Sequence, residues 1–324
     1  MRRPVLLVVL FALALSLCGG AQASQLVDRN AKNVKLAVDR KGQALVTYRV
    51  GRRVRHVLIW GAVNARPPSQ SVPQVRFKVD YSGGWGTFGH TVWQHFTNAC
   101  RAYDGPELPF LVKACRAPDG SYWALQSWQR LYPNLGFLPW LPHQSAWELH
   151  VSHWTGELPR LEVYTDWVYS RRFEQVFGRL TYQGQPVYGF KTNRYGARLD
   201  KYGRLIYLDT YDSPAYGSGW RRENSFVTHN PTGMFCYGFY QFDPGKGGYE
   251  KPATWPAGQM RGPGTGVRYR ITTEGPGVTP DISTEIAGLH PYDPRNSADV
   301  SYERQMNGIL DSLAAGIDKQ CKVH

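Results

Sequence analysis

The cysteine set and the first 23 residues together place the strongest limit on what this chain can fold into. Arg2 and Arg3 precede an apolar run over 5–17, and Ala21-Gln22-Ala23 offers the small-x-small site that a signal peptidase needs. The segment is therefore expected to be a secretory signal peptide. Its removal discards Cys18 and leaves an even set of cysteines in an oxidising compartment: Cys100, Cys115, Cys236 and Cys321.

Two disulfide bonds are expected in the exported chain. Four cysteines allow three pairings. Cys100 and Cys115 have only 14 residues between them, so a bond there closes a short loop easily. That choice leaves Cys236 to pair with Cys321. In the chain-entropy account, a loop of the first size contributes about 3 kcal/mol.

The leader has two other interpretations, and its residues argue against both. As a membrane span it is too short, because its apolar run is about 13 residues and a spanning helix needs roughly 20. A lipoprotein signal would place a small residue before Cys18, but Leu17 stands there. No later segment is apolar enough to span a membrane, so the exported chain is expected to be soluble.

Composition favours β structure. Glycine and proline supply 56 residues and aromatic side chains 44, which suits short strands joined by tight turns. The sequence predicts a mainly β fold of β-sandwich type, with one large domain or two packed ones. We place the boundary near residue 170, between a β-rich region over 24–170 and a second region over 171–324.

The exported chain is strongly basic. Loss of Arg2 and Arg3 lowers the formal net charge from +13 to +11. A basic protein outside the cytoplasm attracts anionic polymers, such as cell-wall polymers with phosphate or carboxylate groups and acidic glycans. Nucleic acid is a less natural partner there. Positive charge also aids solubility without any specific partner, so charge alone names no ligand.

Residues 44–60 are expected to form a hairpin with arginines at its tip. Apolar and polar residues alternate over 44–50, Gly51 marks a turn, and the alternation resumes over 54–60. The tip residues either bind an anion or discourage strands from pairing edge to edge. They are Arg49, Arg52, Arg53 and Arg55.

Six of the eleven tryptophans lie between residues 122 and 169. Because aromatic faces stack on sugar rings, one interpretation is a glycan-binding platform. The interpretation that we favour is that most of these rings fill the core between two sheets. The six are Trp123, Trp128, Trp140, Trp147, Trp154 and Trp167.

A more specific pattern lies between residues 177 and 208. GRLTYQGQPVYGF over 178–190 precedes DKYGRLIYL over 200–208. This resembles the carboxypeptidase regulatory-like module, a secreted β-sandwich with a G-x-V-x-x-x-G-x-P-V-x-G start and a D-x-x-G-x-Y/F strand. The match covers about 35 of the 324 residues and departs at Phe190 and Lys191. The resemblance implies a β-sandwich without catalytic activity.

Residues 209–242 are expected to form an irregular loop that carries the binding site. The segment is dense in polar and aromatic side chains, and Cys236 anchors its far end. Asp209 and Asp212 could assemble a site with His229, although the sequence does not show that they are close. The candidate binding residues combine this loop with the hairpin tip: Arg52, Arg53, Arg55, Tyr211, Asp212, Tyr216, Trp220, Arg221, Arg222 and His229.

Two helices and a late strand complete the expected elements. Spacing of apolar residues predicts a short helix near 91–100, and alternation predicts a strand over 267–273. An amphipathic helix is expected near 298–320, capped by Ser297 or Asp299. Its apolar stripe is a docking face, which a Cys236–Cys321 bond would hold against the β structure. The stripe comprises Met306, Ile309, Leu310, Leu313 and Ile317.

Familiar catalytic and metal-binding patterns do not occur. The sequence has no G-x-S-x-G, H-E-x-x-H, phosphate-loop or C-x-x-C motif. His150 and His153 would point to opposite faces of a strand, which argues against a zinc site. Glu162 and Asp166 would lie roughly 13 Å apart on one strand face, farther than the paired carboxylates of a glycosidase. No cofactor or metal is expected.

Three functions remain after these arguments. The favoured one is a non-catalytic protein that binds a cell-envelope glycan or an anionic polymer. A secreted hydrolase of cell wall or polysaccharide would need clustered carboxylates, or a histidine–carboxylate pair, in a cleft. A protein-interaction module would show a broad exposed apolar patch.

Overall fold

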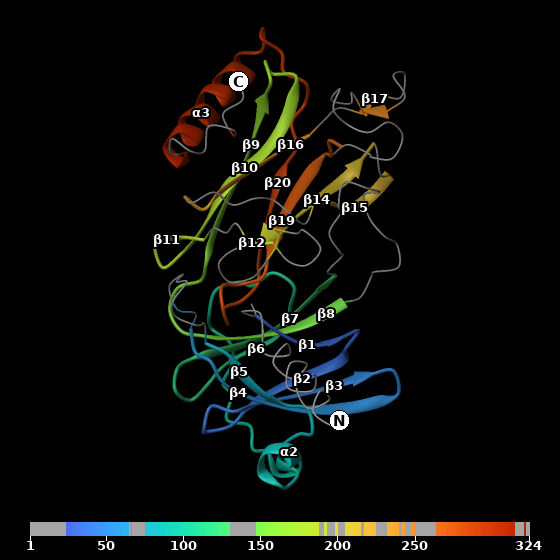
Figure 1. The fold of residues 1–324 in the computed structure, drawn as a ribbon, viewed down its shortest axis with the longest axis vertical. Coiled ribbons are helices and arrows are strands. Elements are labelled where there is room, and N and C mark those ends of the chain that lie inside the picture. The colour runs from blue at the N-terminus through green and yellow to red at the C-terminus, as the bar shows by residue number, and fades with distance from the viewer. Residues whose placement is uncertain are drawn as a thin grey trace, which may run out of the picture.

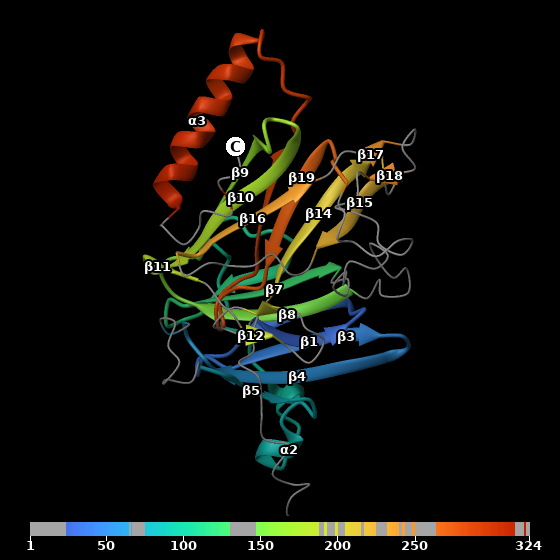
Figure 2. The same ribbon diagram turned by 45° about the horizontal axis from the view of Figure 1, so that its top comes forward.

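The structure is a computed structural model in which two β-sandwiches are stacked along the long axis of the molecule (Figures 1 and 2). It describes residues 24–64, 66, 75–129, 147–187, 191–192, 198–199, 205–214, 217–224, 232–239, 242–243, 248–249, 264–314 and 321. The leader over 1–23 lies outside these residues. So do Trp140, Tyr216, His229 and Ile317.

The first sandwich packs two antiparallel four-stranded sheets, in the orders β1-β8-β7-β6 and β2-β3-β4-β5. Its strands are β1 (Gln25–Arg29), β2 (Lys32–Val38), β3 (Ala44–Val50), β4 (Arg53–Gly61), β5 (Phe77–Asp80), β6 (Leu111–Arg116), β7 (Tyr122–Gln129) and β8 (Trp147–Trp154).

Alternation of apolar residues builds the core of this first sandwich. In β3, Ala44, Val46 and Tyr48 are buried against Trp123 and Val151 of the facing sheet. The hairpin expected over 44–60 is confirmed, with β3 and β4 paired in register around Gly51. The expected Cys100–Cys115 bond is also present, and its Cα atoms are 5.7 Å apart.

The second sandwich has one sheet in the order β11-β10-β16, with β9 also paired to β10, and a facing sheet in the order β15-β14-β19-β20. Its strands are β9 (Arg160–Val168), β10 (Phe173–Tyr182), β11 (Gln185–Pro186), β14 (Ile206–Ser213), β15 (Gly217–Asn224), β16 (Met234–Phe239), β19 (Arg268–Thr273) and β20 (Ile282–Ala287). Two short pairs accompany them: β12 (Lys191–Thr192) with β13 (Arg198–Leu199), and β17 (Phe242–Asp243) with β18 (Gly248–Tyr249).

The mainly β, sandwich-type fold expected from composition is therefore confirmed. The change from one sandwich to the other falls between β8 and β9, and residue 170 itself lies in the turn that joins β9 to β10. Residues 274–281 contact the first sandwich again. The side chain of Gln126 in β7 forms two 2.8 Å hydrogen bonds with the backbone of Asp281, one as donor and one as acceptor.

The expectation of an irregular loop over 209–242 is wrong for most of that segment. Residues 206–213 and 217–224 form the hairpin β14–β15, and β16 lies in the same stretch of sequence. The ladder of β14–β15 shifts register twice and Asp212 has a positive φ of 50°. Such irregularities break the period-two pattern by which strands are recognised.

The C-terminal helix is confirmed, with a different cap. Helix α3 (Ser297–Leu313) begins after Asn296, whose side chain accepts a hydrogen bond from the Ala298 N–H. Met306, Leu310 and Leu313 pack with Phe177 of β10 and Met234 of β16. The expected Cys236–Cys321 bond is present and fastens the chain beyond α3 to β16.

The helix expected near 91–100 is shorter than predicted. One 3₁₀ turn, η1, covers Val92–His95, and the chain from Phe96 to Cys100 is not helical. A separate four-residue helix, α2 (Trp85–Phe88), precedes it. In Figure 1, α2 and α3 lie at opposite ends of the molecule.

Candidate functional site

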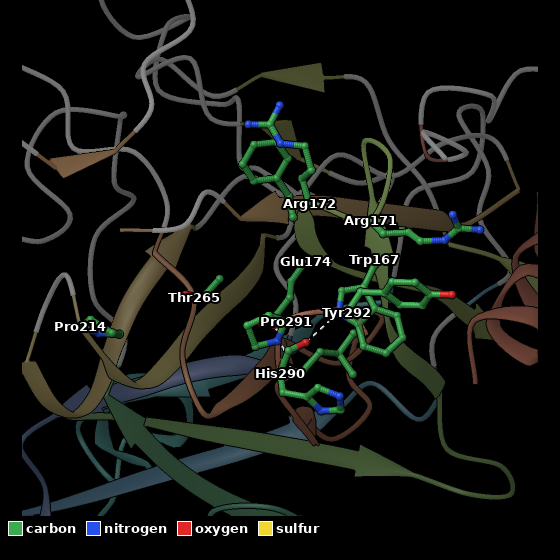
Figure 3. A pocket seen from close by; sticks show the side chains of 11 residues that line it. Trp167, Arg171, Arg172, Glu174, Pro214, Thr265, His290, Pro291 and Tyr292 are labelled. Carbon is green, nitrogen blue, oxygen red and sulfur yellow. Dashed lines mark hydrogen bonds between the residues drawn. The ribbon is translucent and has the colours of Figure 1, made fainter. Parts of the chain in front are cut away.

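An open cavity of about 490 Å³ lies in the second sandwich, where the β9–β10 turn meets the segment that leads into α3. Figure 3 shows its wall, which combines side chains from four separate parts of the chain. Residues 167–174 supply one side, Pro214 and Thr265 lie across from them, and residues 289–292 close the base.

The turn that presents two of the lining arginines has an unusual backbone. Tyr169, Ser170 and Arg171 all have positive φ, at 51°, 59° and 64°. The Arg172 N–H closes the turn by donating to the Val168 carbonyl at 3.1 Å. Left-handed conformations cost energy for residues other than glycine, and such costs concentrate at functional sites. The turn therefore holds Arg171 and Arg172 at the edge of the cavity in a backbone conformation that few sequences adopt.

Cationic and aromatic side chains are held together on one side of the cavity. The guanidinium of Arg171 lies 5.0 Å from the ring centre of Tyr292 and donates to Glu303 of α3 at 2.6 Å. The Tyr292 hydroxyl donates to the same carboxylate at 3.2 Å. The Trp167 ring meets Tyr292 edge to face at 5.1 Å. Arg171 is 52% exposed, so its charge remains available to solvent and to a ligand.

Glu174 is the acidic residue among the described lining residues. The Tyr269 hydroxyl donates to Glu174 Oε2 at 2.7 Å, and the Leu289 N–H donates to the same oxygen at 3.1 Å. Burial raises the pKa of Glu174 to about 7, although both hydrogen bonds oppose the shift. Near neutral pH this carboxyl is partly protonated, which reduces its repulsion of an anion.

A histidine–carboxylate pair stands at the base of the cavity. His290 Nε2 contacts both carboxylate oxygens of Asp299, at 3.0 and 2.9 Å. The Asp299 carboxylate also accepts a hydrogen bond from the Asp293 N–H, which with His290 lowers the pKa of this carboxyl. The His290 carbonyl accepts a bond from Trp167 Nε1 at 2.8 Å, drawn as a dashed line in Figure 3. These bonds fix the histidine beside the aromatic wall.

Two predicted residues, Tyr211 and Trp220, come together near the cavity. Their ring centres are 5.1 Å apart on the β14–β15 hairpin. Pro214, the residue that follows β14 in the same hairpin, lines the cavity. The guanidiniums of Arg268 and Arg270 lie 5.4 and 4.3 Å from the Trp220 ring. Sequence reasoning missed both of these arginines, which alternate along β19.

The other predicted residues of this hairpin have structural partners. Arg222 is buried and contacts Asp209 at 2.6 Å, and its guanidinium lies 4.3 Å from the Tyr207 ring. Asp212 accepts a bond from the Gly219 N–H at 2.5 Å, inside the hairpin. Arg221 donates to the Trp220 carbonyl. Tyr216 and His229 lie outside the described residues.

The predicted arginines of the first sandwich do not join this site. Arg52 and Arg53 are exposed at the β3–β4 turn, and Arg55 contacts Asp28 at 2.7 Å. In Figure 2 the β3–β4 hairpin lies in the lower sandwich, away from β9 and β10. The two halves of the candidate set are therefore separate surfaces.

The tryptophans of residues 122–169 mostly fill the core, as we favoured. Trp123, Trp128, Trp154 and Trp167 are buried, whereas Trp147 is 52% exposed. The described tryptophans therefore form no extended exposed platform, and among them Trp167 lines the cavity.

Serine, histidine and aspartate also meet in a buried cluster between the two sandwiches, which we call the Asp281 cluster: Ser24, Gln126, Trp128, Glu148, His150 and Asp281. His150 Nδ1 lies 2.8 Å from Asp281 Oδ2 and 3.2 Å from Ser24 Oγ. A nucleophile relay needs the serine and the aspartate on different ring nitrogens. Here both contact Nδ1, and all three residues are buried, so the geometry is not that of a hydrolase triad.

The charge state of the Asp281 cluster follows from its contacts. Burial lowers the pKa of His150, but the Asp281 carboxylate overcomes this and raises it to about 10. His150 in turn lowers the pKa of Asp281 against the effect of burial. His153 projects to the other face of β8, where it lies 3.1 Å from the Gly61 carbonyl, as expected for its spacing.

Comparison with known proteins adds no identity. No protein-family model, curated protein or solved structure matches the chain. Within the described residues, no helix has the length and apolar character to cross a membrane. The same part of the chain contains no group of three histidine, cysteine or acidic residues placed to hold a metal ion.

Proposed function

We propose that the protein binds a glycan or polymer that carries anionic groups, and that the cavity beside the β9–β10 turn is the binding site. The observation that carries this proposal is the combination of Arg171, Arg172 and His290 with the rings of Trp167 and Tyr292 in one concave site. Arginine forms paired hydrogen bonds with carboxylate and phosphate groups. Aromatic faces stack on sugar rings.

The chemistry of the wall supports binding without catalysis. Among the described lining residues Glu174 is the carboxylate. Asp166 lies on the adjacent strand β9, where it is paired across the ladder with Gln175, the residue after Glu174. Adjacent positions in a strand project to opposite faces, so Asp166 and Glu174 do not share the cavity. A glycosidase needs two carboxylates on either side of the bond that it cleaves. The two disulfides support the proposal that binding takes place outside the reducing cytoplasm.

The test is a binding assay on soluble and insoluble polysaccharides. Polymers with carboxylate or phosphate groups should be retained and should be released by salt, whereas neutral glycans should bind more weakly. The R171A/R172A double variant should lose about tenfold in affinity. The R52A/R53A double variant removes the same charge from the β3–β4 turn and should bind as the wild type does. Equal losses in both variants would mean that net charge, rather than the cavity, is responsible.

A second candidate, hydrolysis at the same site, is favoured by one observation. The cavity is lined by His290, which pairs with Asp299 behind it, and by Glu174, a carboxyl with a pKa of about 7, and such groups can transfer protons. If the protein cleaves the polymer that it binds, E174Q should abolish product release and keep binding. Retained polymer that stays intact over prolonged incubation would rule this candidate out.

A further inference from the structure

The buried position of Ser24 carries an inference that is independent of the cavity. Ser24 directly follows the expected cleavage site Ala21-Gln22-Ala23, so it would be the first residue of the exported chain. Chain ends are usually exposed and loosely held. Ser24 is instead 4% exposed in the chain that still carries the leader. A chain end that kept this burial after cleavage would need a partner for its charge.

The side chain of Ser24 is fixed within the Asp281 cluster. Its hydroxyl donates to Asp281 Oδ1 and lies 3.2 Å from His150 Nδ1. Asp281 Oδ1 also accepts from the Gly275 N–H at 3.1 Å, and Oδ2 accepts from Trp128 Nε1 at 2.8 Å. The carboxylate therefore joins the start of the chain to strand β7 and to the segment between β19 and β20.

The backbone nitrogen of Ser24 must lie close to the same carboxylate. Three bonds separate this nitrogen from the Oγ of its own side chain, which is a distance of about 3 Å. Since Oγ contacts Asp281, the nitrogen lies within about 6 Å of the Asp281 carboxylate. At that distance, in a buried site, an ammonium and a carboxylate attract each other strongly.

Carboxylates gather near Ser24. Asp281, Glu148 and Glu274 are buried in this region, and Glu274 acts electrostatically on His150. The cations that face them include His150, and Arg29, which contacts Glu148 at 2.8 Å. A free α-amino group has a pKa of about 7.7–8.0 and is therefore mostly protonated at neutral pH.

We infer that hydrolysis of the Ala23–Ser24 bond creates an α-ammonium group on Ser24 that pairs with Asp281 and locks β1 and the junction of the two sandwiches. A leader-cleaving protease adds water across this amide bond. Ala23 becomes the C-terminus of the released leader and carries the new carboxylate. The Ser24 nitrogen becomes the α-amine of the exported chain and takes up a proton. The precursor has a neutral amide nitrogen at this place, so the mature junction is more stable than that of the precursor.

The first experiment is export of the full-length chain followed by intact-mass measurement and N-terminal sequencing. The inference expects a chain that starts at Ser24, and any other first residue overturns it. Periodate then reports on burial, because it oxidises an N-terminal serine only when the amine and hydroxyl are accessible. Oxidation should be roughly a hundredfold slower in the native protein than in urea. Equal rates would contradict a buried terminus.

A second experiment separates the ion pair from simple burial. A chain with one alanine ahead of Ser24 should melt several degrees below the chain that begins at Ser24, and D281N should erase this difference. A gap that persists in D281N would refute the ion pair. Because D281N also removes other hydrogen bonds and its folding is at risk, the pKa of the amine provides a second readout. The pH dependence of its acylation should give a pKa above that of a free α-amine, and a value at or below the free one would refute the pairing.

Discussion

The two sandwiches each contain buried strand carboxyls whose pKa values are shifted, and the shifts run in opposite directions. In the first sandwich, hydrogen bonds from Ser82 and Thr87 outweigh burial and lower the pKa of Asp80. In the second, burial dominates and raises the pKa of both Asp166 and Glu174 to about 7. Hydrogen bonds therefore keep Asp80 ionised. Asp166 and Glu174 are costly to ionise, and Glu174 lines the cavity, where such shifted carboxyls are candidates for a functional role.

The two sandwiches also differ in the loops that their disulfides close, and this difference predicts the largest effects on stability. The Cys236–Cys321 bond joins residues 85 apart in sequence, whereas Cys100–Cys115 joins residues 15 apart. Loop entropy predicts that replacing Cys236 and Cys321 by serine lowers the free energy of unfolding by about 4–5 kcal/mol. Replacing Cys100 and Cys115 by serine should lower it by about 3 kcal/mol. Urea unfolding of the two double variants measures both losses. A larger loss for the Cys100–Cys115 variant would reverse the expected order.

Removal of a core side chain from α3 should affect the second sandwich alone. Leu310 is fully buried, so L310A should cost about 3 kcal/mol. Amide hydrogen exchange should accelerate over residues 297–313 and at the cavity, because Glu303 of the same helix holds Arg171 and Tyr292. V57A in the first core is the matched control, since Val57 is also fully buried. If both variants loosen β3 and β4 equally, the sandwiches unfold as one unit.

The pH dependence of stability should differ between the two sandwiches. The folded pKa of Glu174 lies above its usual value of 4.5, so the folded state is destabilised as the pH rises between 4.5 and about 7. The wild type should therefore lose about 2–3 kcal/mol of its free energy of unfolding through Glu174 between pH 5 and pH 8, and E174Q should not show this loss. D80N should do the reverse, because the folded pKa of Asp80 is lowered and its stabilisation is lost as the pH falls through that pKa. Parallel pH profiles for wild type and E174Q would show that Glu174 is not strained by burial.

The smallest expected effect concerns ligand binding. At pH 8 the ionised Glu174 should repel an anionic polymer, so E174Q should bind about threefold more tightly than the wild type. At pH 5.5 the carboxyl is protonated and the two proteins should bind equally. Titration of polymer at both pH values measures this, with R52A/R53A as a control for changes in overall charge. Tighter binding of E174Q at pH 5.5 alone would contradict the electrostatic account.

Sequence reasoning succeeded where local patterns decide the structure. Strict alternation identified β3 and β4, the apolar stripe identified α3, and short separation identified the Cys100–Cys115 pair. It failed for β14–β15, because the hairpin contains register shifts and a positive φ at Asp212 that disguise its strands. It also misplaced the cap of α3, because Asn296, Ser297 and Asp299 all carry side chains that can cap a helix.

The cavity could not be predicted from the sequence, for a different reason. Its wall joins residues 167–174, 214, 265 and 289–292, whose proximity depends on how the β9–β10 turn meets the chain ahead of α3. The consecutive arginines 171 and 172 after a strand were the one available signal. Tyr211 and Trp220, chosen for their chemistry, do lie close to each other, but Arg222 proved to be a buried partner of Asp209.

The contact between Ser24 and Asp281 also has a consequence for the order of assembly. These residues are 257 apart in sequence, and β1 pairs with β8, more than a hundred residues downstream. A chain made from its N-terminus holds the segment after the leader without its final partners until residue 281 has been synthesised. Folds with such distant contacts form slowly. Assembly of the first sandwich is therefore expected to finish only after synthesis has reached residue 281, so that the first residues of the exported chain are among the last to be placed.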